Sequence, residues 1–135
     1  PYLYHTACQS HQSGIPMIRP LVMEYPKDPI AKTQNLSYML GDALLISPGF
    51  DRDEYELYLP EGRWQDIESK EVYEGMTFVH IENKAFADGG TSLRVFQKEG
   101  TSIPLFAQKE VLHVPAQLWK QEDLEFMTFQ KKDVD

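Results

Sequence analysis

A change of hydrophobic period near residue 43 constrains the fold of this chain more than any other feature. From there onward apolar and polar residues alternate with a period of two, and turn-forming residues recur about every eight to twelve positions. Such alternation indicates strands with one buried and one solvated face. In segment 54–59 the expected buried face holds Tyr55, Leu57 and Leu59, and the solvated face holds Glu54, Glu56 and Tyr58. The pattern predicts an antiparallel β-sandwich.

Turn signals divide this region into short segments. We predict strands over residues 43–46, 54–59, 63–68, 71–73, 77–82, 92–98, 103–106, 111–114 and 124–130. Pro60-Glu61-Gly62 matches a type I turn. We expect this turn to join strands 54–59 and 63–68 as a hairpin.

The first thirteen residues are predicted to form a helix. Leu3, Ala7 and Cys8 recur at helical spacing, which places them on an apolar, buried face. Pro1 suits the first helical turn, and Gly14 suits the left-handed residue that ends a helix.

Residues 15–25 are apolar with little alternation, which is typical of a strand covered on both faces, as in a parallel sheet. A turn cluster over 26–29 and a short link over 30–40 follow. We place a domain boundary after Asp42, which gives units of 1–42 and 43–135. The apolar opening Tyr2-Leu3-Tyr4 leads us to expect that the chain is part of a larger protein.

Composition narrows the classes of partner. Hydrophobic residues make up 41% and charged residues 25%, as in globular domains. With 13 Lys plus Arg against 21 Asp plus Glu, the net charge of −8 disfavours nucleic acid and anionic membranes as partners. No apolar run approaches the roughly 20 residues that span a bilayer. The single cysteine, Cys8, leaves the compartment open, with the cytoplasm favoured.

His5, Cys8 and His11 stand three residues apart, and imidazole and thiolate are zinc ligands. However, six residues carry a helix through about 600 degrees, so the two histidines diverge. A nucleophilic Cys8 requires an accessible electropositive site, whereas the expected position is the apolar face. We predict neither a metal site nor a thiol nucleophile here.

Acid/base chemistry needs two carboxylates held in one place. The candidates are Asp42, Asp51, Asp53, Glu54, Asp66 and Glu68, and the sequence does not pair them. Charged residues that alternate along edge strands usually form a solvated face. Asn35-Leu36-Ser37 matches the N-glycosylation acceptor pattern, which matters only in a secreted protein.

Aromatic residues, 12% of the chain, leave a second interpretation open. An exposed aromatic row could stack on sugars and make the chain a carbohydrate-binding module without chemistry, with Trp64 and Trp119 as the contact residues. Burial of Trp64 against the sheet is the more favoured alternative. A third interpretation is a scaffold that does no chemistry and binds no sugar.

Several segments occur in the order seen in one enzyme family. They are 14–21 (GIPMIRPL), 24–28 (EYPKD), 38–48 (YMLGDALLISP), 58–64 (YLPEGRW), 73–75 (YEG) and 93–104 (LRVFQKEGTSIP). On these segments the chain resembles glycoside hydrolase family 31, the retaining α-glycosidases. The resemblance implies a mainly β chain, in which a helix and the last strand of a (β/α)8 barrel, within 1–42, precede a C-terminal sandwich over 43–135.

The resemblance also implies the activity of the parent protein, which is hydrolysis of terminal α-linked glucosyl or xylosyl residues by two carboxylates about 5 Å apart. The family's nucleophile motif, Trp-x-Asp-Met-Asn-Glu, has no match here. We therefore expect no catalytic, cofactor-binding or metal-binding residue in this chain, and a sugar substrate bound by the rest of the enzyme. Four matching polar residues are expected to form an ion-pair network between barrel and sandwich: Arg19, Glu24, Asp28 and Asp42.

Overall fold

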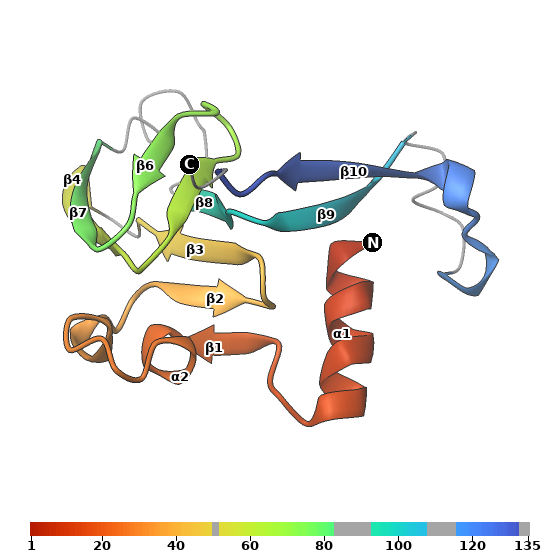
Figure 1. The fold of residues 1–135 in the computed structure, drawn as a ribbon, viewed down its shortest axis with the longest axis horizontal. Coiled ribbons are helices and arrows are strands. Elements are labelled where there is room, and N and C mark those ends of the chain that lie inside the picture. Colours follow the sequence, from red (N-terminus) through yellow and green to blue (C-terminus); the bar gives the residue numbers. More distant parts are fainter. Residues whose placement is uncertain (50–51, 83–92, 108–115, 133–135) are drawn as a thin grey trace.

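The computed structural model describes residues 1–49, 52–82, 93–107 and 116–132 and is mainly antiparallel β, as predicted (Figure 1). A six-stranded sheet has the order β1-β2-β3-β8-β5-β6. Its strands are β1 (Ile18–Pro20), β2 (Tyr38–Leu40), β3 (Leu44–Pro48), β8 (Leu93–Lys98), β5 (Arg63–Asp66) and β6 (Val72–Glu74). Two further pairs are β4 (Glu54–Leu59) with β7 (Thr77–Glu82), and β9 (Thr101–Phe106) with β10 (Leu124–Phe129).

The helices are short apart from the first. They are α1 (Tyr2–Ser13), α2 (Leu21–Glu24) and the 3-10 turns Ala31–Thr33, Ala116–Leu118 and Gln121–Asp123. Within the described part of the chain, no helix is long and apolar enough to cross a membrane.

The core lies between the β4–β7 pair and the six-stranded sheet. Trp64 of β5, Phe96 of β8 and Leu57 of β4 belong to one buried cluster. Leu21 and Met39, from the first 42 residues, belong to the same cluster. The sheet and its core therefore run through position 42, and the proposed domain boundary there stays a prediction.

The strand predictions over 54–59 and 77–82 are confirmed, and the other predicted strands differ from the structure by a few residues where they are described. The segment 111–114 lies outside the described residues. The hairpin between 54–59 and 63–68 is wrong, because β4 pairs with β7 while β5 pairs with β6 and β8. The turn crosses between two sheets and is held by a later segment: Gly75 N donates to Gly62 O at 2.6 Å, and Met76 N donates to Pro60 O at 3.3 Å.

Tyr58 corrects the expected solvated face of β4. Glu54 and Glu56 are exposed as predicted, but Tyr58 is only 1% exposed. Its hydroxyl donates to Asp28 Oδ2 at 2.6 Å, and its ring centroid lies 5.2 Å from that of Phe78. The chain around Asp28 thus covers one end of this face.

The single long strand predicted over 15–25 is wrong. Only Ile18–Pro20 is a strand, it pairs antiparallel with β2, and α2 follows at once. Pro20 lacks an N–H and its φ of −56° suits a helix start, so the ladder ends there. This chain by itself does not cover both faces, since Ile18 is 60% and Met23 48% exposed.

The helix and its Gly14 cap are confirmed, with φ of 76° at Gly14, but the predicted buried face is wrong. Leu3 and Cys8 are exposed, and Thr6 is the buried residue of α1. The Tyr2 hydroxyl donates to Leu40 O at 2.5 Å and accepts from Ala43 N at 3.1 Å. Because a hydrogen-bonding tyrosine, rather than an apolar stripe, docks α1 on the sheet, helical hydrophobic spacing does not identify this face.

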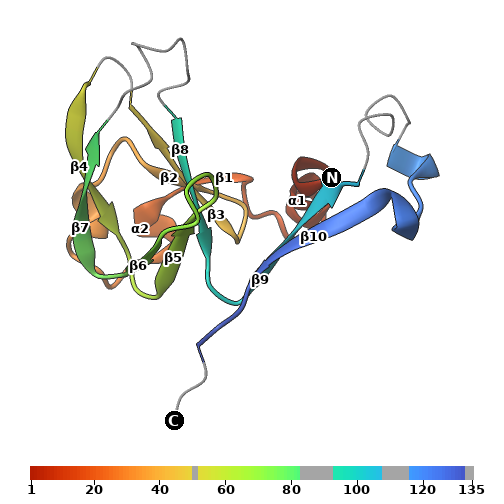
Figure 2. The same ribbon diagram turned by 90° about the horizontal axis from the view of Figure 1, so that it is seen from above.

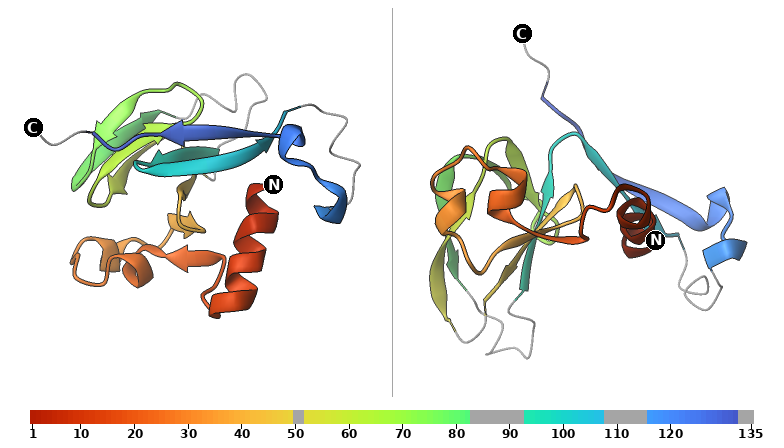
Figure 3. Two further views of the ribbon diagram at one scale, coloured as in Figure 1. Left: turned by 45° about the vertical axis from the view of Figure 1, so that its right-hand side comes forward. Right: turned by 90° about the horizontal axis from the view of Figure 1, so that it is seen from below.

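The β9–β10 pair forms an arm that extends away from the body, alongside α1 (Figures 2 and 3). Gln97 anchors its base, since Nε2 donates to Thr101 O at 3.0 Å and to Met127 O at 2.9 Å. Gly100 N also donates to Phe129 O at 2.6 Å. The arm is therefore fixed to β8 at one end.

Candidate functional site

Arg19 of β1 is the centre of a cluster of charged residues within the first 42 residues. It is 4% exposed, and Nε donates to Pro16 O at 2.7 Å. Nη1 lies 3.0 Å from Glu24 Oε1 and 2.6 Å from Asp42 Oδ1. Burial opposes the charge, but the hydrogen bonds to Asp42 and Glu24 outweigh it and raise the pKa of Arg19. The guanidinium therefore stays charged and ties α2 to the β2–β3 turn.

The predicted network of four polar residues contains three of them. Asp28 lies elsewhere, where Oδ1 accepts from the N–H groups of Ile30 and Ala31 and Oδ2 accepts from Tyr58. The hydrogen bond from Tyr58 lowers the pKa of Asp28, and burial together with this carboxylate raises the pKa of Tyr58 to about 12. Asp28 thus caps a 3-10 turn and fixes it to β4.

The candidate carboxylates have separate surroundings. Asp42 pairs with Arg19, whereas the buried Asp66 lies 2.9 Å from Arg94 Nη1 and accepts from the N–H groups of Glu68 and Ser69. The side chains of Asp53, Glu54 and Glu68 are exposed, and Asp51 lies outside the described residues. Each of the five described candidates thus forms a structural ion pair or lies in solvent.

His5, Cys8 and His11 lie on the exposed side of α1. The expected burial of the thiol is wrong because the helix docks through Tyr2 and Thr6 instead. The prediction that these three residues hold no metal stays a prediction.

Among the aromatic residues, Trp64 is fully buried, and its Nε1 donates to Pro60 O at 2.9 Å. Trp64 therefore has no face open to a sugar. Trp119 is partly buried, with its ring edge-on to Tyr4 at 5.4 Å and to Phe106 at 5.1 Å between centroids. These contacts support packing rather than an exposed aromatic platform.

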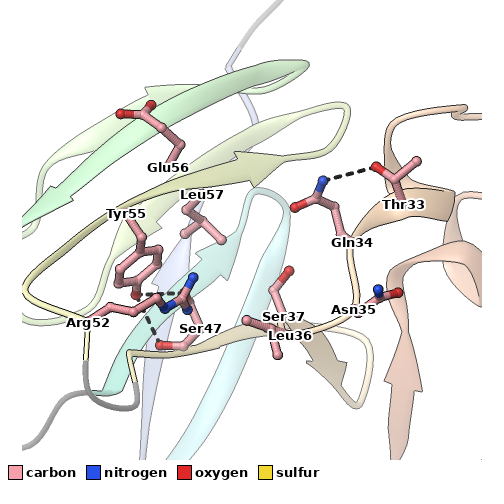
Figure 4. A pocket seen from close by; sticks show the side chains of 10 residues that line it. All are labelled: Thr33, Gln34, Asn35, Leu36, Ser37, Ser47, Arg52, Tyr55, Glu56 and Leu57. Carbon is pink, nitrogen blue, oxygen red and sulfur yellow. Dashed lines mark hydrogen bonds between the residues drawn. The ribbon is translucent and has the colours of Figure 1, made fainter.

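A pocket of about 230 Å³ lies between segment 33–37 and strands β3 and β4 (Figure 4). On its floor, Ser47 Oγ and Tyr55 Oη share a hydrogen bond of 2.8 Å. Arg52 lies 4.1 Å above the Tyr55 ring and donates to Pro48 O at 3.0 Å. Glu56 is the one acidic residue among its described lining, so the pocket lacks the carboxylate pair of a glycosidase.

The sequence marks this region only through Asn35-Leu36-Ser37. Asn35 is exposed and Ser37 is buried, and both line the pocket. The pocket could not be predicted from the sequence, because its walls come from separate segments of the chain and no short motif marks these segments.

A comparison with family models matches residues 14–110 to the glycosyl hydrolase family 31 C-terminal domain. Human neutral alpha-glucosidase AB is 35% identical over 108 residues, which cover 77% of this chain and 11% of that protein. Alpha-glucosidase 2 of Bacillus thermoamyloliquefaciens is 34% identical over 119 residues, covering 85% and 14%. Isomaltosyltransferase of Sporosarcina globispora is 33% identical over 107 residues, covering 78% and 9%. The chain thus spans between 9% and 14% of the length of these relatives.

Solved structures agree with the sequence comparison. A GH31 dextranase of Flavobacterium johnsoniae, complexed with glucose, superimposes with a TM-score of 0.75 at 26% identity, covering 98% of this chain and 16% of that protein. The cycloalternan-forming enzyme of Listeria monocytogenes gives a TM-score of 0.68 at 35% identity, covering 77% and 10%.

Proposed function

This chain belongs to glycosyl hydrolase family 31, and we propose that it serves as the C-terminal domain of a retaining α-glycosidase acting on terminal α-linked glucosyl residues. The match of residues 14–110 to the family's C-terminal domain carries this proposal. Because these relatives are named alpha-glucosidases, we favour glucosyl over xylosyl residues as the substrate of the whole enzyme.

Exposed apolar side chains support the proposal that this chain is part of a larger enzyme. Leu3, Ile15, Ile18 and Met23 are each between 46% and 60% exposed, and all precede β2. Large apolar side chains left this exposed are candidates for packing against another part of a protein. In our proposal the catalytic barrel covers these residues.

The role of the chain in catalysis would be positional. The Arg19 ion pairs hold the first 42 residues together, and the hydrogen bond from Tyr58 to Asp28 fixes this segment to β4. Well-supported scaffolds hold reacting groups in productive geometry without taking part in the chemistry. The two reacting carboxylates would lie in the barrel.

Transfer to a sugar acceptor is a second candidate function. Two of the relatives are named isomaltosyltransferase and 1,6-alpha-glucosyltransferase. A retaining mechanism forms a covalent glycosyl-enzyme, and either water or a sugar hydroxyl can resolve it. Product analysis in the presence of isomaltose or maltose would separate the two outcomes.

The experiment that tests the proposal compares two proteins. The 135-residue chain and the longest product of the same gene are purified and assayed on aryl α-glucoside and aryl α-xyloside. We expect turnover only by a product that contains a catalytic barrel, with the glucoside preferred. Hydrolysis by the 135-residue chain above a mock preparation would contradict the proposal, as would sugar binding by this chain with no turnover by either protein.

A further inference from the structure

Four side chains that can bind a metal share the outer face of the β4–β7 pair. In the strand register Glu54 is directly opposite Glu82, and Glu56 is directly opposite His80. All four residues are exposed. Figure 4 shows Glu56 pointing away from Tyr55 and Leu57, which alternate with it on β4. These four side chains therefore lie side by side on the face opposite the core.

The distances suit a single ion. His80 Nδ1 lies 2.8 Å from Glu56 Oε1, and one ligand atom from each of Glu54, His80 and Glu82 lies within 4.8 Å of the others. Zinc binds nitrogen and oxygen ligands at roughly 2.0–2.2 Å, so ligand atoms around one ion are about 3–4 Å apart. Exposed side chains on neighbouring strands can close this small difference by rotamer changes.

The chemistry distinguishes this group from an ordinary acidic surface. Two glutamates directly opposite each other on paired strands repel, which destabilises the pair unless a cation lies between them. The imidazole adds a ligand that suits zinc and other transition metals, whereas magnesium and calcium prefer oxygen alone. The hydrogen bond between His80 and Glu56 also orients the imidazole ring.

We propose that Glu54, His80 and Glu82 bind one divalent transition-metal ion, with zinc as the best fit, while Glu56 holds the imidazole of His80 in place. The site is independent of the proposed glycosidase function. It joins β4 to β7, whose sequence positions are separated by β5 and β6, so the bound ion stabilises a non-local strand pair.

Calorimetric titration of the complete, chelator-treated gene product with ZnCl₂ tests this site. His80→Ala and Glu82→Gln are expected to lose one zinc site or weaken it at least about tenfold. His11→Ala, which removes an exposed histidine of α1, is the matched control and should bind zinc like the wild type. Far-UV circular dichroism checks that each variant is folded, and the nearly isosteric Glu82→Gln guards against misfolding.

The four proteins distinguish a zinc site on the β4–β7 pair from zinc binding elsewhere. Loss of the site in His80→Ala and Glu82→Gln, but not in His11→Ala, supports the proposal. Equal zinc binding by all four proteins, including none at all, overturns it, and so does a loss in His11→Ala as large as that in His80→Ala.

Discussion

Replacement of Trp64 by alanine is expected to lower the free energy of unfolding by about 3–5 kcal/mol. Trp64 is fully buried in the cluster between β4 and the six-stranded sheet, where it packs with Phe96 and Leu57. Its indole N–H donates to Pro60 O, so truncation leaves a cavity and also removes this buried hydrogen bond. A loss of this size is a large share of the roughly 5–15 kcal/mol typical of whole domains.

Urea unfolding followed by far-UV circular dichroism measures this effect without relying on the fluorescence of the residue removed. Trp119→Ala is the matched control, because Trp119 is only partly buried and makes edge-on contacts with Tyr4 and Phe106. We expect it to cost about 1–2 kcal/mol. Equal stability of Trp64→Ala and wild type, or a larger loss in Trp119→Ala, would contradict the core described here.

The second large effect is expected for Gly75→Ala, which should destabilise the protein by about 3 kcal/mol. Gly75 lies between β6 and β7, and its backbone N–H donates to Gly62 O. A Cβ there would collide with the carbonyl oxygens of Pro60 and Gly62, which are backbone atoms and cannot rotate away. The turn that carries the chain from β4 to β5 would have to move.

Gly14→Ala provides the comparison for this variant. Gly14 has φ of +76°, but a Cβ added there would meet nothing within 4 Å, so only the left-handed backbone cost of about 1–2 kcal/mol applies. Thermal melts of both variants should therefore show the larger shift for Gly75→Ala. Similar shifts would mean that the contact between the Pro60–Gly62 turn and Gly75 is not needed.

Local alternation predicts individual strands better than their partners. Segments 54–59 and 77–82 can be identified because a period of two is visible in the sequence. Their pairing with each other cannot, since the predicted turn at Pro60 suggests a neighbour that the structure places in another sheet. Partner choice depends on which faces are buried together, and a single sequence does not contain that information.

Buried polar side chains account for other differences between the predicted and the observed structure. Arg19 is buried with an ion pair to Asp42, and Tyr58 is buried with a hydrogen bond to Asp28; both partners are more than twenty positions away. Thr6 is buried where it closely approaches Gly41. Hydrophobic spacing does not report such contacts. The grouping of Arg19 with Glu24 and Asp42 is expected only from the family resemblance, and the pocket beside Tyr55 is not expected at all.

In our proposal this chain supports a glycosidase without supplying a reacting group. The most direct test replaces each candidate carboxylate by its amide in the complete gene product and measures kcat on an aryl α-glucoside. The six variants are Asp42→Asn, Asp51→Asn, Asp53→Asn, Glu54→Gln, Asp66→Asn and Glu68→Gln. We predict that kcat stays within about threefold of wild type in all six, with Asp66→Asn lowering the melting temperature because it weakens a buried ion pair. A drop in kcat by a factor of about 10² to 10⁴ in a variant that remains folded would identify a catalytic carboxylate in this chain and contradict its proposed supporting role.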